Sequence, residues 1–358
     1  MTAEVDRPAP VRRTPAHHWS LRWDGGAAEH VADLHALRVL IDERRSRPGA
    51  ARGVAWANLE RGQGAELASL ADELHLDDEA LEDLTGPMER AKLDVGRDVA
   101  VVVTRGWTFD PATCRLTTYP VSAVVSDGVL ITIADPDPFV TGFDRRVSGC
   151  TGVVTAGHLL YEMLDLIVDG YAAIYEQVAD AVDELSERVF EDKPLTRDEQ
   201  IRSFHLRRSL TLMRKVGVPM RDVTTALAKA ARTDGADGGV EDGADWLTGQ
   251  LPTSTARRFD DVADHVAHVA EGVDGLREVM STLIETNLSL ADVRLNTVMK
   301  KLASWAALIA VPTLITGFMG MNVPYPGYDT EAGFLGALVV MVVAVGTLIV
   351  LFKRRDWL

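Results

Sequence analysis

The sequence predicts an α+β membrane protein: a cytoplasmic α/β domain, a long helical stalk and two C-terminal transmembrane helices. Two charge-free apolar runs, 302–319 and 332–352, are each long enough to cross a hydrocarbon core about 30 Å thick at 1.5 Å per residue. Ahead of them, β-branched runs dominate up to about residue 140, and apolar residues at three-four spacing dominate from about residue 157. These three observations give the fold class.

The first 18 residues form a predicted disordered tail, because proline and charge dominate it and it has no apolar core of the signal-peptide type. The net charge of −16 and the pI of about 5.0 disfavour a nucleic-acid partner, since such domains show a basic footprint. Two cysteines, Cys114 and Cys150, argue against a disulfide framework, as expected in the cytosol.

Residues 19–156 are predicted to form the cytoplasmic α/β domain. The pattern at 53–60 alternates as in a strand, and Asp127-Gly128 is a turn signal between two β-rich segments. Asp77 or Asp78 can cap a helix. The expected elements are a strand at 53–60, short helices at 66–74 and 77–84, a buried strand at 98–105, and a hairpin at 116–135.

Residues 157–250 are predicted to be a cytoplasmic helical segment. A helix is expected over 158–189 and is broken at 193–196. Thr196 with Glu199 forms a capping box that starts a second helix, 201–216, and a third helical stretch ends near Arg232. The Gly/Asp-rich segment 233–245 is predicted to be a flexible loop.

Residues 251–301 are predicted to be the stalk helix, which runs into the first transmembrane helix without a stop. From 254 to 319 the helix would be about 100 Å long, and a helix of that length needs packing partners. Pro312 should bend it, with the hydroxyls of Thr313 and Thr316 available to satisfy the freed carbonyl.

The charges that flank the apolar runs predict the orientation. Lys300 and Lys301 precede the first run and a basic segment, 353–358, follows the second, whereas the loop at 320–331 has acidic residues and no Lys or Arg. The positive-inside rule therefore places both termini in the cytoplasm and this loop outside a cell membrane.

Two helices per chain cannot enclose an aqueous path, so conduction requires several copies. The candidate lining residues recur at near three-four spacing on the first transmembrane helix: Asn296, Met299, Leu302, Leu308 or Ile309, Thr313, Gly317 and Gly320. Rings of Met299 and Leu302 would form a hydrophobic constriction that gates by dewetting. The alternative is that the small residues simply let helices pack closely and the larger ones make ordinary contacts.

Several segments resemble the CorA family of divalent-cation channels. Gly320-Met321-Asn322 is similar to its Gly-Met-Asn signature, and the segment 296–302 is similar to its approach to the membrane. The stalk sequence 259–265 resembles the family's Asp-Val-Tyr-Asp-His element with Ala263 in place of the aromatic, and the C-terminal 353–358 matches its basic, Trp-Leu ending. Glu82-Asp83-Leu84 with Arg90-Ala91-Lys92 is similar to its Glu-Asp … Arg-Pro-Lys element.

This resemblance covers residues from about 50 to 358 and implies a homopentamer with a cytoplasmic funnel that passes Mg2+ and often Co2+ or Ni2+. It assigns the entrance to Gly320, Met321 and Asn322, where a ring of five amide oxygens can accept hydrogen bonds from the waters of a hydrated ion. Met319 departs from the aromatic residue that usually precedes this signature.

The same resemblance places regulatory divalent ions between neighbouring funnel domains, and Asp83 and Asp261 are the matching carboxylates. Glu285 on the stalk would form an inner acidic ring. The alternative is that Asp83 is a helix-terminus or surface acid and that Asp261 is an exposed acid of the stalk.

No enzyme signature is found, and no Gly-rich phosphate loop indicates ATP-driven pumping. Two alternatives remain. One is a proton-coupled Zn2+ transporter of the ZntB branch on the same fold. The other is a membrane-anchored scaffold or sensor, for which the hairpin is only an anchor.

Overall fold

The computed structural model describes residues 18–22, 29–30, 39, 54–62, 64–86, 90–135, 139–150, 154–191, 193–232, 251, 253–321, 327 and 330–357. Nearly all of the predicted tail, the predicted loop at 233–245 and Asn322 lie outside these residues. The chain divides into two compact units. The first comprises Met1–Arg188 and Leu195–Met280, and the second comprises Val189–Pro194 and Ser281–Leu358.

A seven-stranded mixed sheet forms the centre of the first unit. Its described strands run in the order β2-β1-β3-β7-β6-β5-β4. The pairing of β3 with β7 is parallel, with Ala57 opposite Ile131, and the neighbouring pairs are antiparallel. The strands are β1 His18–Arg22, β2 Glu29–His30, β3 Val54–Leu59, β4 Lys92–Val95, β5 Val99–Asp110, β6 Arg115–Ser126 and β7 Val129–Ala134.

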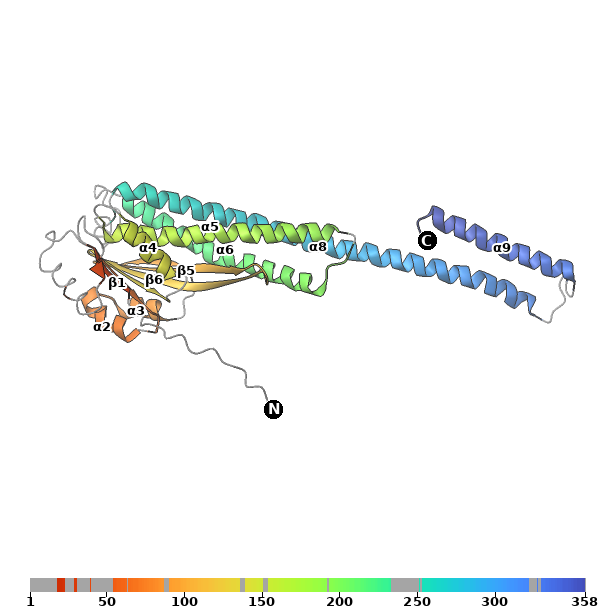
Figure 1. The fold of residues 1–358 in the computed structure, drawn as a ribbon, viewed down its shortest axis with the longest axis horizontal. Helices are drawn as coiled ribbons and strands as arrows, with labels where there is room; N and C mark the ends of the chain where they lie inside the picture. The colour runs from red at the N-terminus through yellow and green to blue at the C-terminus, as the bar shows by residue number, and fades with distance from the viewer. Residues whose placement is uncertain are drawn as a thin grey trace, which may run out of the picture. The chain divides into compact units, whose positions relative to one another are not determined.

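Two short helices, α2 (Gly64–Leu74) and α3 (Asp78–Thr85), cover one face of the sheet (Figure 1). Their leucines join alternate residues of β3, β5 and β7 in one buried core cluster. Asp77 caps α3 by accepting a hydrogen bond of 2.8 Å from the amide of Ala80. Both predicted helices and the predicted cap are therefore confirmed.

The opposite face is covered by the short helix α4 (Thr141–Gly149) and the long helix α5 (Ala156–Phe190) (Figure 1). Trp56 of β3 meets Phe143 of α4 edge to face at 4.8 Å, and Trp107 of β5 stacks on Tyr171 of α5 at 3.9 Å. Because both faces are covered, all six residues of β3 are buried. The alternating pattern at 53–60 is typical of one-sided burial, and here it was misleading.

The helix α6 runs without interruption from Arg197 to Arg232, with Pro219 inside it. The sequence predicted two separate helical stretches here, which is wrong. Ser209 of α6 fixes the helix to the sheet, because its hydroxyl accepts from the Leu116 amide at 2.9 Å and donates to the Cys114 carbonyl at 3.1 Å.

The longest helix, α8, extends over 67 residues from Thr253 to Met319, and α9 follows at Glu331–Arg354. These are the two helices in the described part of the chain that are long and apolar enough to cross a membrane. Beside Pro312, the Thr313 hydroxyl donates to the Ile309 carbonyl at 2.8 Å and the Thr316 hydroxyl to the Pro312 carbonyl at 3.0 Å. Neither of these two bonds goes to the carbonyl of Leu308, four residues before the proline, which is the carbonyl that Pro312 leaves without its helical donor.

Candidate functional site

The two apolar helices form a hairpin in which the start of the apolar part of α8 lies beside the C-terminal end of α9. The Ser304 hydroxyl of α8 lies 3.5 Å from the Trp357 carbonyl, and Ser304 is fully buried. The Trp357 ring in turn stacks on Phe352 at 5.8 Å. This contact brings Lys300 and Lys301 to the same end of the hairpin as the basic segment at the end of α9, as the orientation prediction requires.

One face of α8 carries the predicted lining residues. Met299 and Leu302 are 62% and 66% exposed, and Asn296 and Thr313 are also exposed. Ile309, Thr313 and Gly317 line one apolar groove, whose described lining does not include Leu308. The structure therefore favours Ile309 over Leu308 for this face.

Gly317 leaves room on that face for another chain. A Cβ atom built on Gly317 would meet nothing within 4 Å, so packing within the described chain does not require a glycine there. Small residues on a membrane helix allow the backbone of a second helix to approach closely.

The turn between the two apolar helices begins where α8 ends. The Gly320 amide bonds the Thr316 carbonyl at 2.9 Å and the Met321 amide bonds the Phe318 carbonyl at 3.2 Å, so Gly320 and Met321 close the last turn of the helix. Asn322, the third residue of the signature, lies outside the described residues.

The second half of the turn is built by residues that the sequence analysis missed. The Thr330 hydroxyl accepts from the Gly333 amide at 3.1 Å and donates to the Gly327 carbonyl at 2.8 Å. Gly327 has φ +90°, and a Cβ atom on Gly333 would come within 2.0 Å of the Gly327 carbonyl oxygen. The sequence signal that could have indicated this turn was Thr330, an N-cap residue type directly before the second apolar run, with Gly333 in the first turn of the helix.

Of the two candidate regulatory carboxylates, Asp83 on α3 is already paired within the chain. Its carboxylate forms an ion pair with the ammonium of Lys92, and both side chains are about 30% exposed. The hydrogen bond that Lys92 donates to the Asp83 carboxylate raises the pKa of Lys92 above its ordinary value, against the lowering effect of burial. A divalent ion at Asp83 would have to compete with this ammonium.

Asp261 and Glu285 are exposed on α8. The neighbour of Asp261, Asp260, forms an ion pair of 2.9 Å with Arg232 of α6. No ion pair or hydrogen bond of the described residues joins Asp83 to Asp261.

Arg294 also ties α8 to the turn between α5 and α6. Its guanidinium donates to the backbone carbonyls of Glu191 at 2.9 Å and Lys193 at 3.3 Å. Nothing in the sequence pattern indicated this contact, which joins residues about 100 positions apart.

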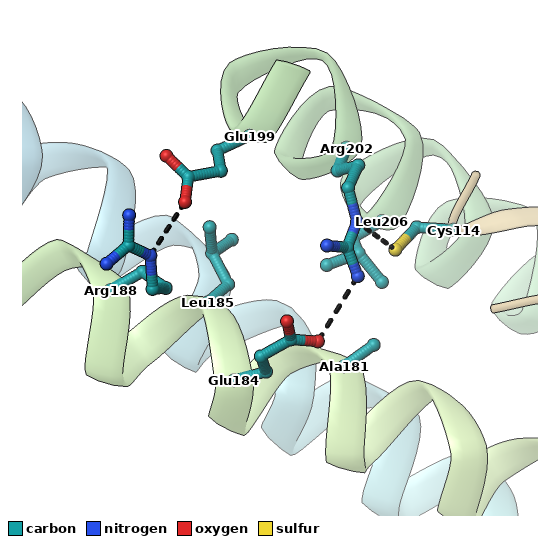
Figure 2. A pocket seen from close by; sticks show the side chains of 8 residues that line it. All are labelled: Cys114, Ala181, Glu184, Leu185, Arg188, Glu199, Arg202 and Leu206. Carbon is teal, nitrogen blue, oxygen red and sulfur yellow. Dashed lines mark hydrogen bonds and ion pairs between the residues drawn. The ribbon is translucent and has the colours of Figure 1, made fainter. Parts of the chain in front are cut away.

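A small pocket lies between α5 and α6 beneath Cys114 (Figure 2). Arg188 donates to Glu199 at 2.7 Å, and Arg202 donates to Glu184 at 3.2 Å, so the two pairs cross-link the helices on either side of the pocket. Each charged side chain that lines the pocket pairs with a side chain of opposite charge. We therefore interpret the pocket as part of the packing between α5 and α6 and not as a binding site.

Comparison with known proteins finds a family model, described as CorA-like Mg2+ transporter protein, that matches residues 51–354. The chain is 28% identical over 285 residues to the cobalt/magnesium transport protein CorA of Thermotoga maritima, which covers 78% of this chain and 76% of that protein. It is 23% identical over 209 residues to the zinc transport protein ZntB of Yersinia enterocolitica, 58% of each chain.

The fold agrees with these matches. The complete structure of the CorA magnesium transporter from Methanocaldococcus jannaschii superposes with a TM-score of 0.72 at 20% identity, and the match covers 95% of this chain and 99% of that one. The predicted fold class is confirmed: a mixed sheet with helices, a long stalk helix and two apolar C-terminal helices.

Proposed function

This chain belongs to the family of CorA-like Mg2+ transporter proteins, and from this membership we propose that it is a homopentameric channel for hydrated divalent cations. Its cargo is chiefly Mg2+, and also Co2+ or Ni2+. The names of its relatives support magnesium and cobalt as cargo. Transport is driven by the membrane potential, which contributes about 2.3 kcal/mol per elementary charge for each 100 mV.

The observation that carries the proposal is the row of apolar and small residues along one exposed face of α8. Met299, Leu302, Ile309, Thr313 and Gly317 share this face at 3.6 residues per turn, and a single chain leaves it exposed. Five copies around an axis would cover the flanks of the helix and leave this face toward a central path. In the closed state, rings of Met299 and Leu302 stop a hydrated ion, because its waters find no hydrogen-bond partners there.

Asn322 follows the end of α8 in the sequence and forms the proposed entrance. Mg2+ gives up its waters reluctantly, so a site that accepts hydrogen bonds from those waters can hold the ion without stripping them. Neutral amide oxygens also let the ion leave, which conduction requires. Carboxylates in the same ring would hold it more tightly.

Regulation is proposed to depend on Asp83 and Asp261. Divalent ions bound between chains at these carboxylates would hold the pentamer closed when cytoplasmic Mg2+ is high. The ion pair of Asp83 with Lys92 supports a competitive version of this switch. At low Mg2+ the ammonium neutralises Asp83 within its own chain, and at high Mg2+ the ion replaces it.

Uptake of Mg2+ and Co2+ into liposomes that contain the purified protein tests the proposal. Asn322→Ala is expected to reduce uptake at least about tenfold, which corresponds to about 1.4 kcal/mol of lost transition-state stabilisation. Asn287→Ala, the same change on α8 outside the apolar run, should transport as the wild type does.

Assembly of the Asn322→Ala variant is checked by its size in detergent. Wild-type uptake by an assembled Asn322→Ala oligomer would remove Asn322 from the entrance. Absence of any divalent uptake by the wild type itself would instead favour the scaffold reading.

A zinc transporter of the ZntB type is the second candidate, and the similarity to the Yersinia enterocolitica protein favours it. The two candidates differ in their coupling. Zn2+ uptake that requires an inward proton gradient, with Mg2+ uptake absent, would select the ZntB type. Mg2+ uptake that is indifferent to the proton gradient would select the channel.

A further inference from the structure

Three potential metal ligands of different chemistry converge where α4 ends and α5 begins. Cys150 is the C-terminal cap of α4, while His158 and Glu162 lie one turn apart near the start of α5. The thiol sulfur, an imidazole nitrogen and a carboxylate oxygen all lie within 4.8 Å of one another. The three side chains are half-buried, and His158 and Glu162 are 21% and 17% exposed.

The local structure holds these residues in place. The Thr155 hydroxyl accepts from the His158 amide at 3.1 Å and so fixes the first turn of α5. Residues at i and i+4 of a helix project from the same face, which aligns His158 with Glu162. Their ligand atoms are 3.7 Å apart. In a tetrahedral site with bonds of 2.0–2.3 Å, ligand atoms are separated by roughly 3.3–3.8 Å, so this pair already has the required spacing.

We propose that Cys150, His158 and Glu162 form a resident binding site for a borderline divalent ion of the Zn2+, Co2+ or Ni2+ class, with water as the fourth ligand. Sulfur and imidazole ligands select such ions, whereas Mg2+ takes oxygen ligands. The site thus differs in selectivity from the pathway along α8. It does not depend on the proposed transport function.

The charges around the site permit a dication. Arg146 lies 3.5 Å from Glu162 and Arg258 lies 4.0 Å from it, and both cations oppose a metal ion. Arg146, however, also pairs with Asp165 and Asp169, so it keeps two carboxylate partners when the ion takes Glu162. A thiolate and a carboxylate together balance the charge of the ion.

Binding exchanges one interaction of the thiol for another. The Cys150 thiol donates to the Arg146 carbonyl at 3.3 Å. When the ion binds, the sulfur–metal bond forms as the sulfur–hydrogen bond breaks, and the proton is released to solvent. All three ligand atoms lie within 4.8 Å of one another, so the sulfur has to move inward by no more than about 1 Å to reach a tetrahedral separation of about 3.8 Å. Rotation of a side chain at the helix end can supply this shift.

Cobalt titration of the purified full-length protein, in a large excess of Mg2+, tests the site. The excess of Mg2+ occupies oxygen-ligand sites and leaves a sulfur site free. One equivalent of Co2+ per chain should produce thiolate-to-cobalt charge-transfer absorption. Cys150→Ser should abolish this band, and His158→Gln should weaken Co2+ binding at least about 10- to 100-fold, the loss usual even for residues that only support a ligand.

The second cysteine provides the matched control. Cys114 is buried beside Arg202 in the α5–α6 pocket, and Cys114→Ser should leave the cobalt band unchanged. X-ray absorption of cobalt-loaded wild type, which needs no variant to fold, should show one sulfur at about 2.3 Å. Absence of sulfur from the coordination sphere, or a band that survives Cys150→Ser, would overturn the proposal.

Discussion

The carboxylate of Glu199 both caps α6 and joins it to α5. One oxygen accepts from Arg188 at 2.7 Å, and the other accepts from the amide and hydroxyl of Thr196 at 2.7 and 2.9 Å. The Arg188 hydrogen bond, followed by those from Thr196, lowers the pKa of Glu199 to about 2. A carboxyl with a depressed pKa stabilises the folded protein above its unfolded pKa of about 4.3, and the stabilisation is lost as the pH falls toward 2.

Glu199→Gln is therefore expected to lower the melting temperature at pH 7, and the difference from the wild type should shrink between pH 4.3 and 2. Asp198→Asn, one position earlier on the same exposed turn, controls for charge at the helix N-terminus. Thermal unfolding of the purified protein measures both variants. A difference that persists at pH 2 would assign the role of Glu199 to packing instead.

Residue-scale signals succeeded where both partners are close in sequence. The caps at Asp77 and Thr196 and the turn at Gly128, with φ +66°, were all predicted from local patterns. The ion pair of Asp83 with Lys92 and the convergence of Cys150 with His158 were not, because tertiary packing decides which polar side chains meet.

At the scale of elements, the N-terminus of α9 depends on a close approach of two glycines. The Cβ atom of an alanine at 333 would lie 2.0 Å from the Gly327 carbonyl oxygen, which is backbone and cannot rotate away. Gly333→Ala should therefore displace the turn at a cost of about 1–3 kcal/mol, the usual range for overpacking. We expect a lower melting temperature together with reduced ion uptake.

Gly336→Ala is the matched control for this prediction. It lies one turn further along α9, and an added Cβ there meets nothing within 4 Å. In water, a helix with alanine at an interior position is more stable than one with glycine there by about 0.5–1 kcal/mol. If Gly333→Ala were as well tolerated as Gly336→Ala, the tight turn would not matter for transport.

Elements were predictable in type but less so in extent. Apolar periodicity identified α2, α3, α5 and α8. It failed at α6, where Pro219 lies inside a continuous helix that the sheet supports through Ser209. The alternating pattern of β3 also suggested burial on one face only, because the sequence of a strand does not reveal that helices cover its second face.

At the scale of the whole molecule, the proposed gate can be tested at Leu302. Leu302→Asn places polar groups in the apolar ring and should wet the constriction, and Met299→Asp should do so more strongly. A reduction of the barrier by about 1.4 kcal/mol raises flux about tenfold. Liposome flux at high internal Mg2+, the condition under which the proposed regulation closes the wild type, provides the measurement.

Leu290→Asn makes the same chemical change on α8 before the apolar run and should leave basal flux unchanged. If the liposome flux of Leu302→Asn were no larger than that of the wild type, Leu302 would not be part of the gate. If the variant altered the oligomeric state but created no conductance, the result would favour the alternative in which the hairpin is only a membrane anchor.

Regulation by Asp261 predicts a difference in proteolysis between Mg2+ and a chelator. Mg2+ bound between chains should protect the wild type from protease, and Asp261→Lys should lose most of that protection. Glu271→Lys carries the same charge change at another exposed position of α8 and should retain it. Equal digestion of the wild type with Mg2+ and with EDTA would contradict regulation through this carboxylate.

The parallel pairing of β3 with β7 has a consequence for biosynthesis. On the ribosome, β3 can pair with β1 at once, but its other edge waits until β7 has been made, roughly 70 residues later. During that interval a strand with six buried residues presents an open edge, which is a template for pairing with other chains. Slow or interrupted translation between residues 59 and 129 therefore prolongs an aggregation-prone stage, well before the apolar part of α8 requires a membrane.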